Sequence, residues 1–333
     1  MMEQQVKDYP KIELHCHLDG SIRVATLKQM ATKLGRPTKE LDKVVAPEKC
    51  RDLNQYLESF SYVLPLLQNK ENLQLAAYDV MSQAAEENVC YIEIRFAPLL
   101  HQENGLSVPE ILEAVLAGIK QAQAEFDIVG NLLICGMRHH EESANLALVD
   151  QVVGVDEKIV GFDFAGDEAQ FPNSAIASTV KKAKAAGLQI TLHSGECGCA
   201  HNVVEAIQLG ATRIGHGVAA KDDSAVMEFC REHDTLLEMC PTSNLQTNAI
   251  ASWSEYPLRR FLDAGIKCCI NTDNRTVSAT NLTNEYQLLM EHCQLTLAEM
   301  QQLNQNAVDG SFASDEVKVR LSEKLLIGYS ESE

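Results

Sequence analysis

The sequence alternates eight times between short apolar runs and longer stretches of helical pattern. The apolar runs are rich in β-branched residues or Leu and occupy residues 11–18, 89–97, 129–138, 159–166, 188–196, 213–217, 235–244 and 267–274. Helix-like stretches lie between them, among them 108–126, 174–186, 201–209, 222–232 and 255–264. Eight β–α repeats predict a closed parallel barrel, an α/β fold of the (β/α)8 or TIM type. An open, doubly wound sheet is the alternative arrangement of such elements.

The connection over residues 20–88 is too long for one crossover helix. It predicts an extra helical layer inserted after the first strand, containing the amphipathic stretch 53–67. There Leu57, Phe60 and Leu64 follow the spacing i, i+3 and i+7 of one helix face. We expect this face to form an apolar lid over the substrate, and packing onto the barrel is the alternative. No linker divides the chain and the tail after residue 298 reads as one or two helices, so we expect one domain over residues 1–333.

The charge balance excludes several kinds of partner. With 28 Lys+Arg against 47 Asp+Glu, the formal net charge is −19. Such a chain repels phosphate backbones and anionic lipid surfaces, so we expect no nucleic acid and no membrane partner. A small, neutral substrate fits the charge better, and no obligatory protein partner is evident.

The cysteines and the start of the chain predict a reduced, cytoplasmic protein. The 11 cysteines are scattered, many of them inside apolar runs, where a thiol acts as a small core residue. The polar start MMEQQVKDYP lacks the apolar stretch of a secretion signal. No apolar run approaches the length of a membrane span.

His15 and His17 are the first residues that suggest chemistry. Residues i and i+2 of a strand project to the same face, so both imidazoles would point into the barrel. Two imidazoles side by side on a buried face fit a divalent metal. A pair of hydrogen-bonded core histidines is the alternative.

Other predicted strands end with residues of the same kind. The carboxyl ends of barrel strands meet at one mouth, where the active sites of such barrels lie. His193 ends the fifth strand and Asp273 ends the eighth. Together with His15 and His17 they would form a set of three nitrogens and one oxygen suited to Zn²⁺, with a position left for water. The fourth strand ends without the lysine that could bridge two metals, so we expect a single metal ion.

Glu196 and His216 are the candidate acid–base residues. Glu196 follows His193 by three, and a straight strand would turn it away from the mouth. Ser194-Gly195 permits the bend that brings Glu196 over the mouth as a proton donor and acceptor. A solvated carboxylate is the alternative. His216 lies between two glycines that allow close approach of backbone and substrate, and a hydrogen-bonded core histidine is the alternative there.

Six blocks of this sequence, in order, resemble the adenosine deaminase family. They are P-K-I-E-L-H-C-H-L-D-G-S at 10–21, F-D-F-A-G-D-E at 162–168, H-S-G-E at 193–196, G-H-G at 215–217, C-P-T-S-N at 240–244 and N-T-D at 271–273. H-x-H alone is a weak signal, but six ordered blocks spanning nearly the whole chain are highly specific.

The resemblance implies zinc-dependent hydrolysis of adenosine, and of 2′-deoxyadenosine, to inosine or its deoxy form and ammonia. It implies one Zn²⁺ per chain, bound by the four residues named above. It further implies that Glu196 is the proton shuttle, that His216 orients the attacking water, and that His17, Asp19 and Gly166 contact the substrate, Asp19 at the ribose and Gly166 through its N–H at the purine. Zinc lowers the pKa of a bound water from about 15.7 to about 7. The activated water would attack C6 of the purine while Glu196 protonates N1.

Two other functions remain open at this point. One is deamination of adenine or of an N6-modified purine nucleotide on the same scaffold. Asp19 opposes a nucleotide, because its carboxylate would repel a 5′-phosphate. The other is an inactive purine-binding or signalling protein, which the complete set of candidate ligands and the shuttle oppose.

Asn274 departs from the family pattern, in which a pair of aspartates closes the eighth strand. Here the sequence reads Asp273-Asn274-Arg275. The second position faces N7 of the purine, which only accepts hydrogen bonds. An asparagine amide donates at any pH, whereas an aspartate donates only when protonated. We therefore expect Asn274 to bind N7, and altered purine recognition is the alternative.

Overall fold

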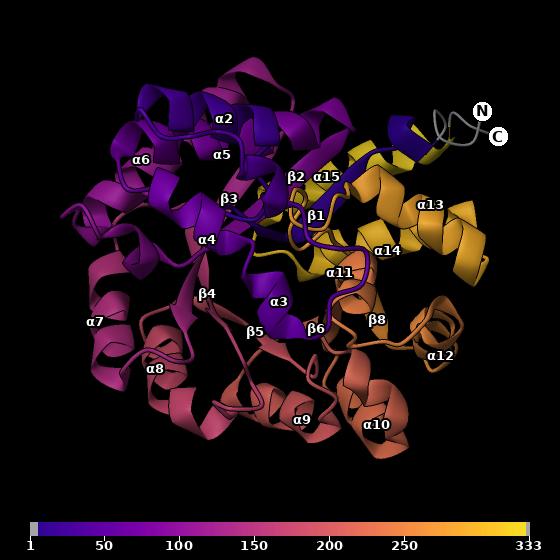
Figure 1. Ribbon diagram of the computed structural model, residues 1–333. Helices are drawn as coiled ribbons and strands as arrows, with labels where there is room; N and C mark the ends of the chain where they lie inside the picture. Colours follow the sequence, from indigo (N-terminus) through magenta and orange to yellow (C-terminus); the bar gives the residue numbers. More distant parts are fainter. Residues whose placement is uncertain (1–5, 331–333) are drawn as a thin grey trace.

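Eight parallel strands form one sheet in sequence order, surrounded by helices (Figure 1). The computed structural model describes residues 6–330, so the first five residues of the polar start, on which part of the secretion argument rests, lie outside the described residues. The strands are β1 Lys11–His17, β2 Val89–Phe96, β3 Val129–Met137, β4 Ile159–Ala165, β5 Gln189–Ser194, β6 Arg213–His216, β7 Leu236–Met239 and β8 Lys267–Ile270. The predicted (β/α)8 barrel is confirmed.

The barrel closes between β8 and β1 through a short bridge beyond the end of β8. Cys16 and Asp273 form an isolated parallel bridge. The His17 amide donates to the Asp273 carbonyl at 2.7 Å, and the Asp273 amide donates to the His15 carbonyl at 2.9 Å. The closing contacts thus fix the backbone of three candidate metal ligands.

Helices cover the outside of the barrel (Figure 1). Their bounds are α5 Lys70–Glu86, α6 Val108–Glu125, α7 Glu142–Val152, α8 Asn173–Ala185, α9 Ala200–Leu209, α10 Ser224–Glu232, α12 Leu258–Asp263, α13 Leu282–Cys293, α14 Leu297–Gly310 and α15 Asp315–Ser330. The short helix α11 Pro241–Gln246 lies at the mouth of the barrel instead. The tail therefore contains the predicted helices. Within residues 6–330, no helix is both long and apolar enough to cross a membrane.

The predicted runs overshoot the last two strands. β7 ends at Met239 rather than at residue 244, because Pro241 occupies the first position of α11. β8 ends at Ile270, and Asp273 has a left-handed backbone with φ 61°. Asp273 is therefore presented from a turn beyond the strand.

The insertion after β1 contains α2 Val24–Lys33 and a broken helical segment over residues 53–67. The prediction of one continuous amphipathic helix there is wrong, since the segment divides into α3 Leu53–Leu57, α4 Phe60–Val63 and the 3-10 turn η2 Leu64–Leu66. Pro65 contributes to the last break, because proline has no N–H to donate to the preceding turn. Figure 1 shows α3 and α4 in front of the barrel strands.

Candidate active site

Four side chains from three strand ends converge at the mouth of the barrel. His15 and His17 come from β1, His193 from β5 and Asp273 from the turn after β8, and one ligand atom of each lies within 4.8 Å of all the others. His193 Nε2 lies 3.1 Å from His15 Nε2 and 3.2 Å from His17 Nε2. Asp273 Oδ1 lies 3.6 Å and 3.3 Å from the same two nitrogens of β1. The structure thus brings all four predicted ligands together.

Buried carboxylates hold two of these imidazoles from behind. His15 Nδ1 lies 2.8 Å from Glu238 Oε2, and His193 Nδ1 lies 2.8 Å from Asp163 Oδ2. Arg95 joins the two carboxylates, at 2.7 Å from Asp163 and 2.8 Å from Glu238. Although burial opposes ionisation, Arg95 and the histidines hold the pKa of both carboxyl groups below the usual range. An ionised carboxylate only accepts, so the Nδ1 of His15 carries the proton and its Nε2 presents a lone pair. The nearby Asp163 carboxylate favours the same tautomer at His193, although His193 Nδ1 makes no hydrogen bond of good geometry.

This arrangement fits a divalent cation. In the tautomer that these carboxylates favour, the Nε2 atoms of His15 and His193, 3.1 Å apart, both present lone pairs. Tetrahedral ligands about 2.0–2.1 Å from zinc stand roughly 3.3 Å apart, and the measured separations between ligand atoms are 3.1–3.6 Å. Ser243 Oγ donates to Asp273 Oδ2 at 2.6 Å and leaves Oδ1 directed at the histidines. The chemistry and spacing of the four donors therefore fit a metal ion.

His216 lies beside the metal cluster in a strained backbone conformation, with φ 64°. A Cβ atom on Gly215 would lie 2.9 Å from His15 Cε1, so the glycine makes room for the His15 ring. Asn244 Nδ2 lies 3.0 Å from His216 Nδ1 and can donate to it. Burial lowers the pKa of His216 to about 4. The ring is therefore neutral, with its proton on Nε2.

Glu196 points into the same cavity, with Oε2 3.7 Å from His216 Nε2. Gly195 has φ 74°, which supplies the expected bend after β5. Burial, together with the Asp273 carboxylate, raises the pKa of Glu196 to about 8. A carboxyl group with its pKa raised in this way can give and take a proton near neutral pH.

A cavity of about 470 Å³ opens over these groups. It is lined by the metal cluster except His15, by Glu196 and His216, and by the remaining predicted substrate contacts Asp19, Gly166 and Asn274. None of its lining residues, all of which lie in the described part of the chain, is Lys or Arg. Asn274 Oδ1 is buried without a hydrogen-bond partner, and a Cβ atom on Gly20 would overlap it.

The insertion supplies an apolar wall of the cavity. Leu57, Phe60 and Leu64 all line it, although they come from α3, α4 and η2 rather than from one helix. They are partly exposed, whereas Tyr56 and Val63 of the same segment are buried. The expected face is therefore directed at the cavity.

Several residues of the site were missed by the sequence analysis. They are Arg95, Asp163, Glu168, Glu238, Ser243 and Asn244. For Asp163 and Glu238 a signal was present, because each is an acidic residue inside an apolar strand run. Arg95 lies in β2, Ser243 and Asn244 lie in the short helix α11, and only Glu168 lies in a loop. All four act through contacts with segments distant in sequence, which no local pattern reports.

Comparison with known sequences shows which family the chain belongs to. Residues 10–327 match the family described as adenosine deaminase. The chain belongs to this family. An adenosine deaminase from Enterococcus faecalis is 50% identical over 99% of both chains. An adenosine deaminase from Streptococcus agalactiae is 44% identical over 99% of this chain and 98% of the relative.

Solved structures share the fold over nearly the whole chain. An amidohydrolase from Burkhoderia ambifaria with bound Zn is 25% identical, with a TM-score of 0.92, over 99% of this chain and 93% of its own. An apo N6-methyl-AMP deaminase from Arabidopsis thaliana is 27% identical, with a TM-score of 0.87, over 99% of both chains. The chain thus shares its fold with a solved structure named for a substrate different from that of the relatives above.

Proposed function

We propose that this protein is an adenosine deaminase that hydrolyses adenosine and 2′-deoxyadenosine to inosine or 2′-deoxyinosine and ammonia. The observation that carries the proposal is that the carboxyl group of Glu196 and the four-residue metal cluster lie at one cavity, with Glu196 Oε2 3.7 Å from His216 Nε2. The family match over residues 10–327 and the 50% identical relative support the same activity. As in the sequence analysis, we assign the reaction to the cytoplasm.

The residues around the cavity divide the chemistry. One Zn²⁺ bound by His15, His17, His193 and Asp273 would supply a water nucleophile at neutral pH. Glu196 donates a proton to N1 of the purine, so that the ring does not develop a full negative charge as C6 is attacked. The neutral His216 directs its Nε2–H at the attacking water and orients it.

The substrate contacts follow from the lining of the cavity. Asp19 binds a ribose hydroxyl, and burial raises the pKa of its carboxyl group to about 6. The Gly166 N–H, in a loop with φ 106°, binds the purine, and His17 lies against the bound nucleoside. Asn274 donates to N7 with its amide nitrogen.

The cavity opposes a nucleotide substrate. A 5′-phosphate is usually bound by Arg, Lys or a helix N-terminus, and the lining holds acidic residues but neither Arg nor Lys. We therefore favour a nucleoside over the N6-modified nucleotides that the Arabidopsis relative is named for.

Substrate profiling tests the activity. Purified protein is expected to convert adenosine to inosine, with a higher kcat/KM for adenosine than for adenine, AMP or N6-methyl-AMP. A preference for any of these three would overturn the proposed substrate, and a chain that turns over none of the four would favour a binding protein.

Metal depletion tests the cofactor. Chelation is expected to remove activity, and added Zn²⁺ is expected to restore it. His193→Ala should lose metal and activity together, because its imidazole contacts both β1 histidines. Full activity in a metal-free preparation would contradict the mechanism.

A further inference from the structure

The carboxylate of Glu168, in the loop after β4, receives four hydrogen bonds from the segment that carries Glu196. The backbone N–H groups of Glu196 and Cys197 donate to Oε1 at 2.6 and 2.8 Å. The Gly195 N–H and the Asn202 side-chain amide donate to Oε2 at 3.0 and 2.9 Å. Glu168 is buried, with 6% of its surface exposed.

Three consecutive N–H groups can reach one carboxylate only where the backbone curls around it. β5 ends at Ser194, and Gly195 then turns with φ 74°. A Cβ atom at Gly195 would lie 2.7 Å from a methyl group of Val203, so the turn leaves no room for a side chain. Without this curl, the strand direction would carry the Glu196 side chain away from the mouth.

The other side of the same turn is held by the loop after β6. The Ala219 N–H donates to the Gly195 carbonyl at 2.9 Å, and the Gly217 N–H donates to the Ser194 carbonyl at 3.0 Å. The two peptide groups that precede Glu196 are therefore held on both sides. The loop after β6 binds their carbonyls, and Glu168 binds their N–H groups. Of these contacts, those from Glu168 are made by a side chain, which mutation can change without altering the main chain.

We propose that Glu168 is a positioning residue for proton transfer, which holds residues 195–197 so that the Glu196 carboxyl group reaches N1 of the purine. The proposal rests on the proposed function. Two carboxylate oxygens offer about four acceptor positions, and four donors occupy them. Glu168 has no capacity left for the substrate, and it does not line the substrate cavity of Glu196 and His216. It acts through Glu196.

Glu168→Gln tests this role because the two side chains have the same shape. In either orientation, the amide places an NH₂ group against two of the four donors. We expect kcat for adenosine to fall about 10- to 100-fold, which is part of the ~10²–10⁴ that general acid–base catalysis contributes, with KM within threefold and the metal content unchanged. Glu168→Asp keeps the charge but is shorter, and its kcat should lie between those of the wild type and Glu168→Gln.

Ligand binding separates positioning from a general structural role. A nucleoside analogue with a tetrahedral carbinol at the six position and an adjacent N–H requires the Glu196 contact, whereas planar 1-deazaadenosine has no N1 to contact. Calorimetry is expected to show that Glu168→Gln raises the Kd of the tetrahedral ligand by the same factor by which it lowers kcat/KM. The Kd of 1-deazaadenosine should stay within twofold of the wild type.

Glu299→Gln is the matched control. Glu299 also accepts a backbone N–H at a helix start, from Thr296 at 2.8 Å, but it lies on the outer helix α14. This variant should leave kcat and both affinities unchanged.

Equal weakening of both ligands, or an unchanged kcat, would overturn the role of Glu168. If Glu168→Gln does not fold, the affinities for the tetrahedral ligand and for 1-deazaadenosine are compared in Glu168→Asp instead. A wild type that does not deaminate adenosine would overturn the proposed function itself, whatever the variants do.

Discussion

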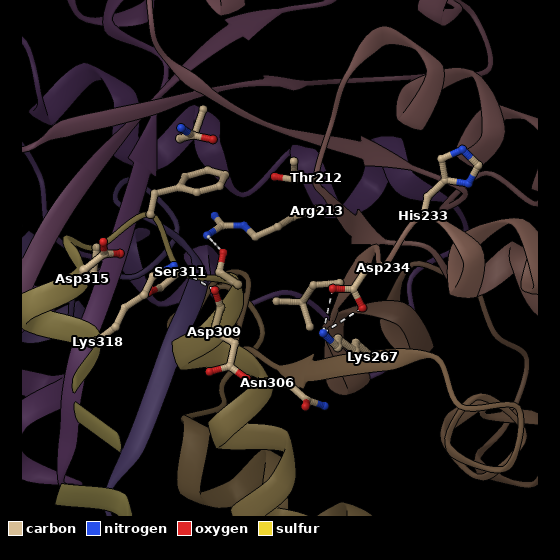
Figure 2. A pocket seen from close by; sticks show the side chains of 15 residues that line it. Thr212, Arg213, His233, Asp234, Lys267, Asn306, Asp309, Ser311, Asp315 and Lys318 are labelled. Atoms are coloured by element: carbon tan, nitrogen blue, oxygen red, sulfur yellow. Dashed lines mark hydrogen bonds and ion pairs between the residues drawn. The ribbon is translucent and has the colours of Figure 1, made fainter. Parts of the chain in front are cut away.

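The two ends of the barrel each hold a cavity, and the cavities differ in how their polar groups are paired. The one at the amino ends of β5–β8 has a volume of about 540 Å³ (Figure 2). Figure 2 shows Lys267 directed at Asp234, and the two are 2.8 Å apart. Lys318 donates to a backbone carbonyl at 2.9 Å, and the Arg213 guanidinium lies over the Phe312 ring. Its cationic groups are already paired.

The cavity at the carboxyl ends is of similar size, about 470 Å³, but its groups are unpaired toward the centre. The lone pairs of His15 and His193 converge with the Asp273 oxygen on one point. At the edge of the site, Asn274 Oδ1 lies against Gly20 and is also buried without a partner. The two cavities therefore differ in the polar groups that are left without partners, rather than in size. The cavity with such groups is the one at the carboxyl ends of the strands.

Buried charges connect the two ends. Arg213 reaches from the amino-end cavity to Glu238, with Nε 2.7 Å from Oε1. Glu238 in turn holds His15 at the mouth. Barrels of this kind usually fill their interior with Val, Ile and Leu. Here charged side chains occupy part of the interior, although burying them costs desolvation free energy. In return they orient the histidines of the metal cluster.

The largest effect is expected from Glu196→Gln at the carboxyl end. Glutamine cannot donate and then recover a proton, so kcat should fall at least ~10²-fold. The bound metal should remain, because Glu196 is not among its ligands. Steady-state kinetics and elemental analysis check both expectations. A variant within tenfold of the wild type would assign the proton transfer to another residue.

Glu238→Gln tests the connection between the ends. It removes the charge that pairs with Arg95 and Arg213 and that holds His15. Metal affinity is expected to fall about 10- to 100-fold, measured by competition with a chelating dye.

Asp234→Asn is the control at the amino end, because Asp234 pairs with Lys267 but its side chain is 73% exposed. It should leave both metal affinity and Tm unchanged. If Glu238→Gln and Asp234→Asn lowered metal affinity equally, the proposed difference between the two ends of the barrel would be wrong.

Asn274→Leu tests the proposed contact between the Asn274 amide nitrogen and N7. We expect kcat/KM for adenosine to fall by an amount equivalent to about 1–3 kcal/mol, since N7 is left buried without a donor. 7-Deazaadenosine, which has no N7, should be a poorer substrate than adenosine for the wild type and should be affected less by the mutation. If the wild type accepts both compounds equally, Asn274 does not contact N7.

Phe60→Ala is expected to have the smallest effect. Phe60 is partly exposed and lines the cavity from α4, so its loss should raise KM several-fold while kcat changes little. Thermal unfolding supplies the comparison. A large fall in Tm with an unchanged KM would favour the alternative that this face only packs on the barrel.

Much of this architecture could be predicted because local patterns carry it. The alternation of apolar runs with helices determines the barrel, and the i, i+2 spacing of His15 and His17 directs both into it. The end of β8 could not be predicted, because Asp273 depends on a left-handed turn and on closure against β1. Glu168 could not be predicted either, since its partners lie almost thirty residues away in sequence.

The position of the metal tests the account most directly. Crystals of the active protein, measured at the zinc absorption edge, are expected to give one anomalous peak per chain. It should lie about 2.0–2.2 Å from Nε2 of His15, His17 and His193 and from Asp273 Oδ1. A peak in the amino-end cavity, two peaks at the mouth, or none in crystals that still deaminate adenosine would contradict the account.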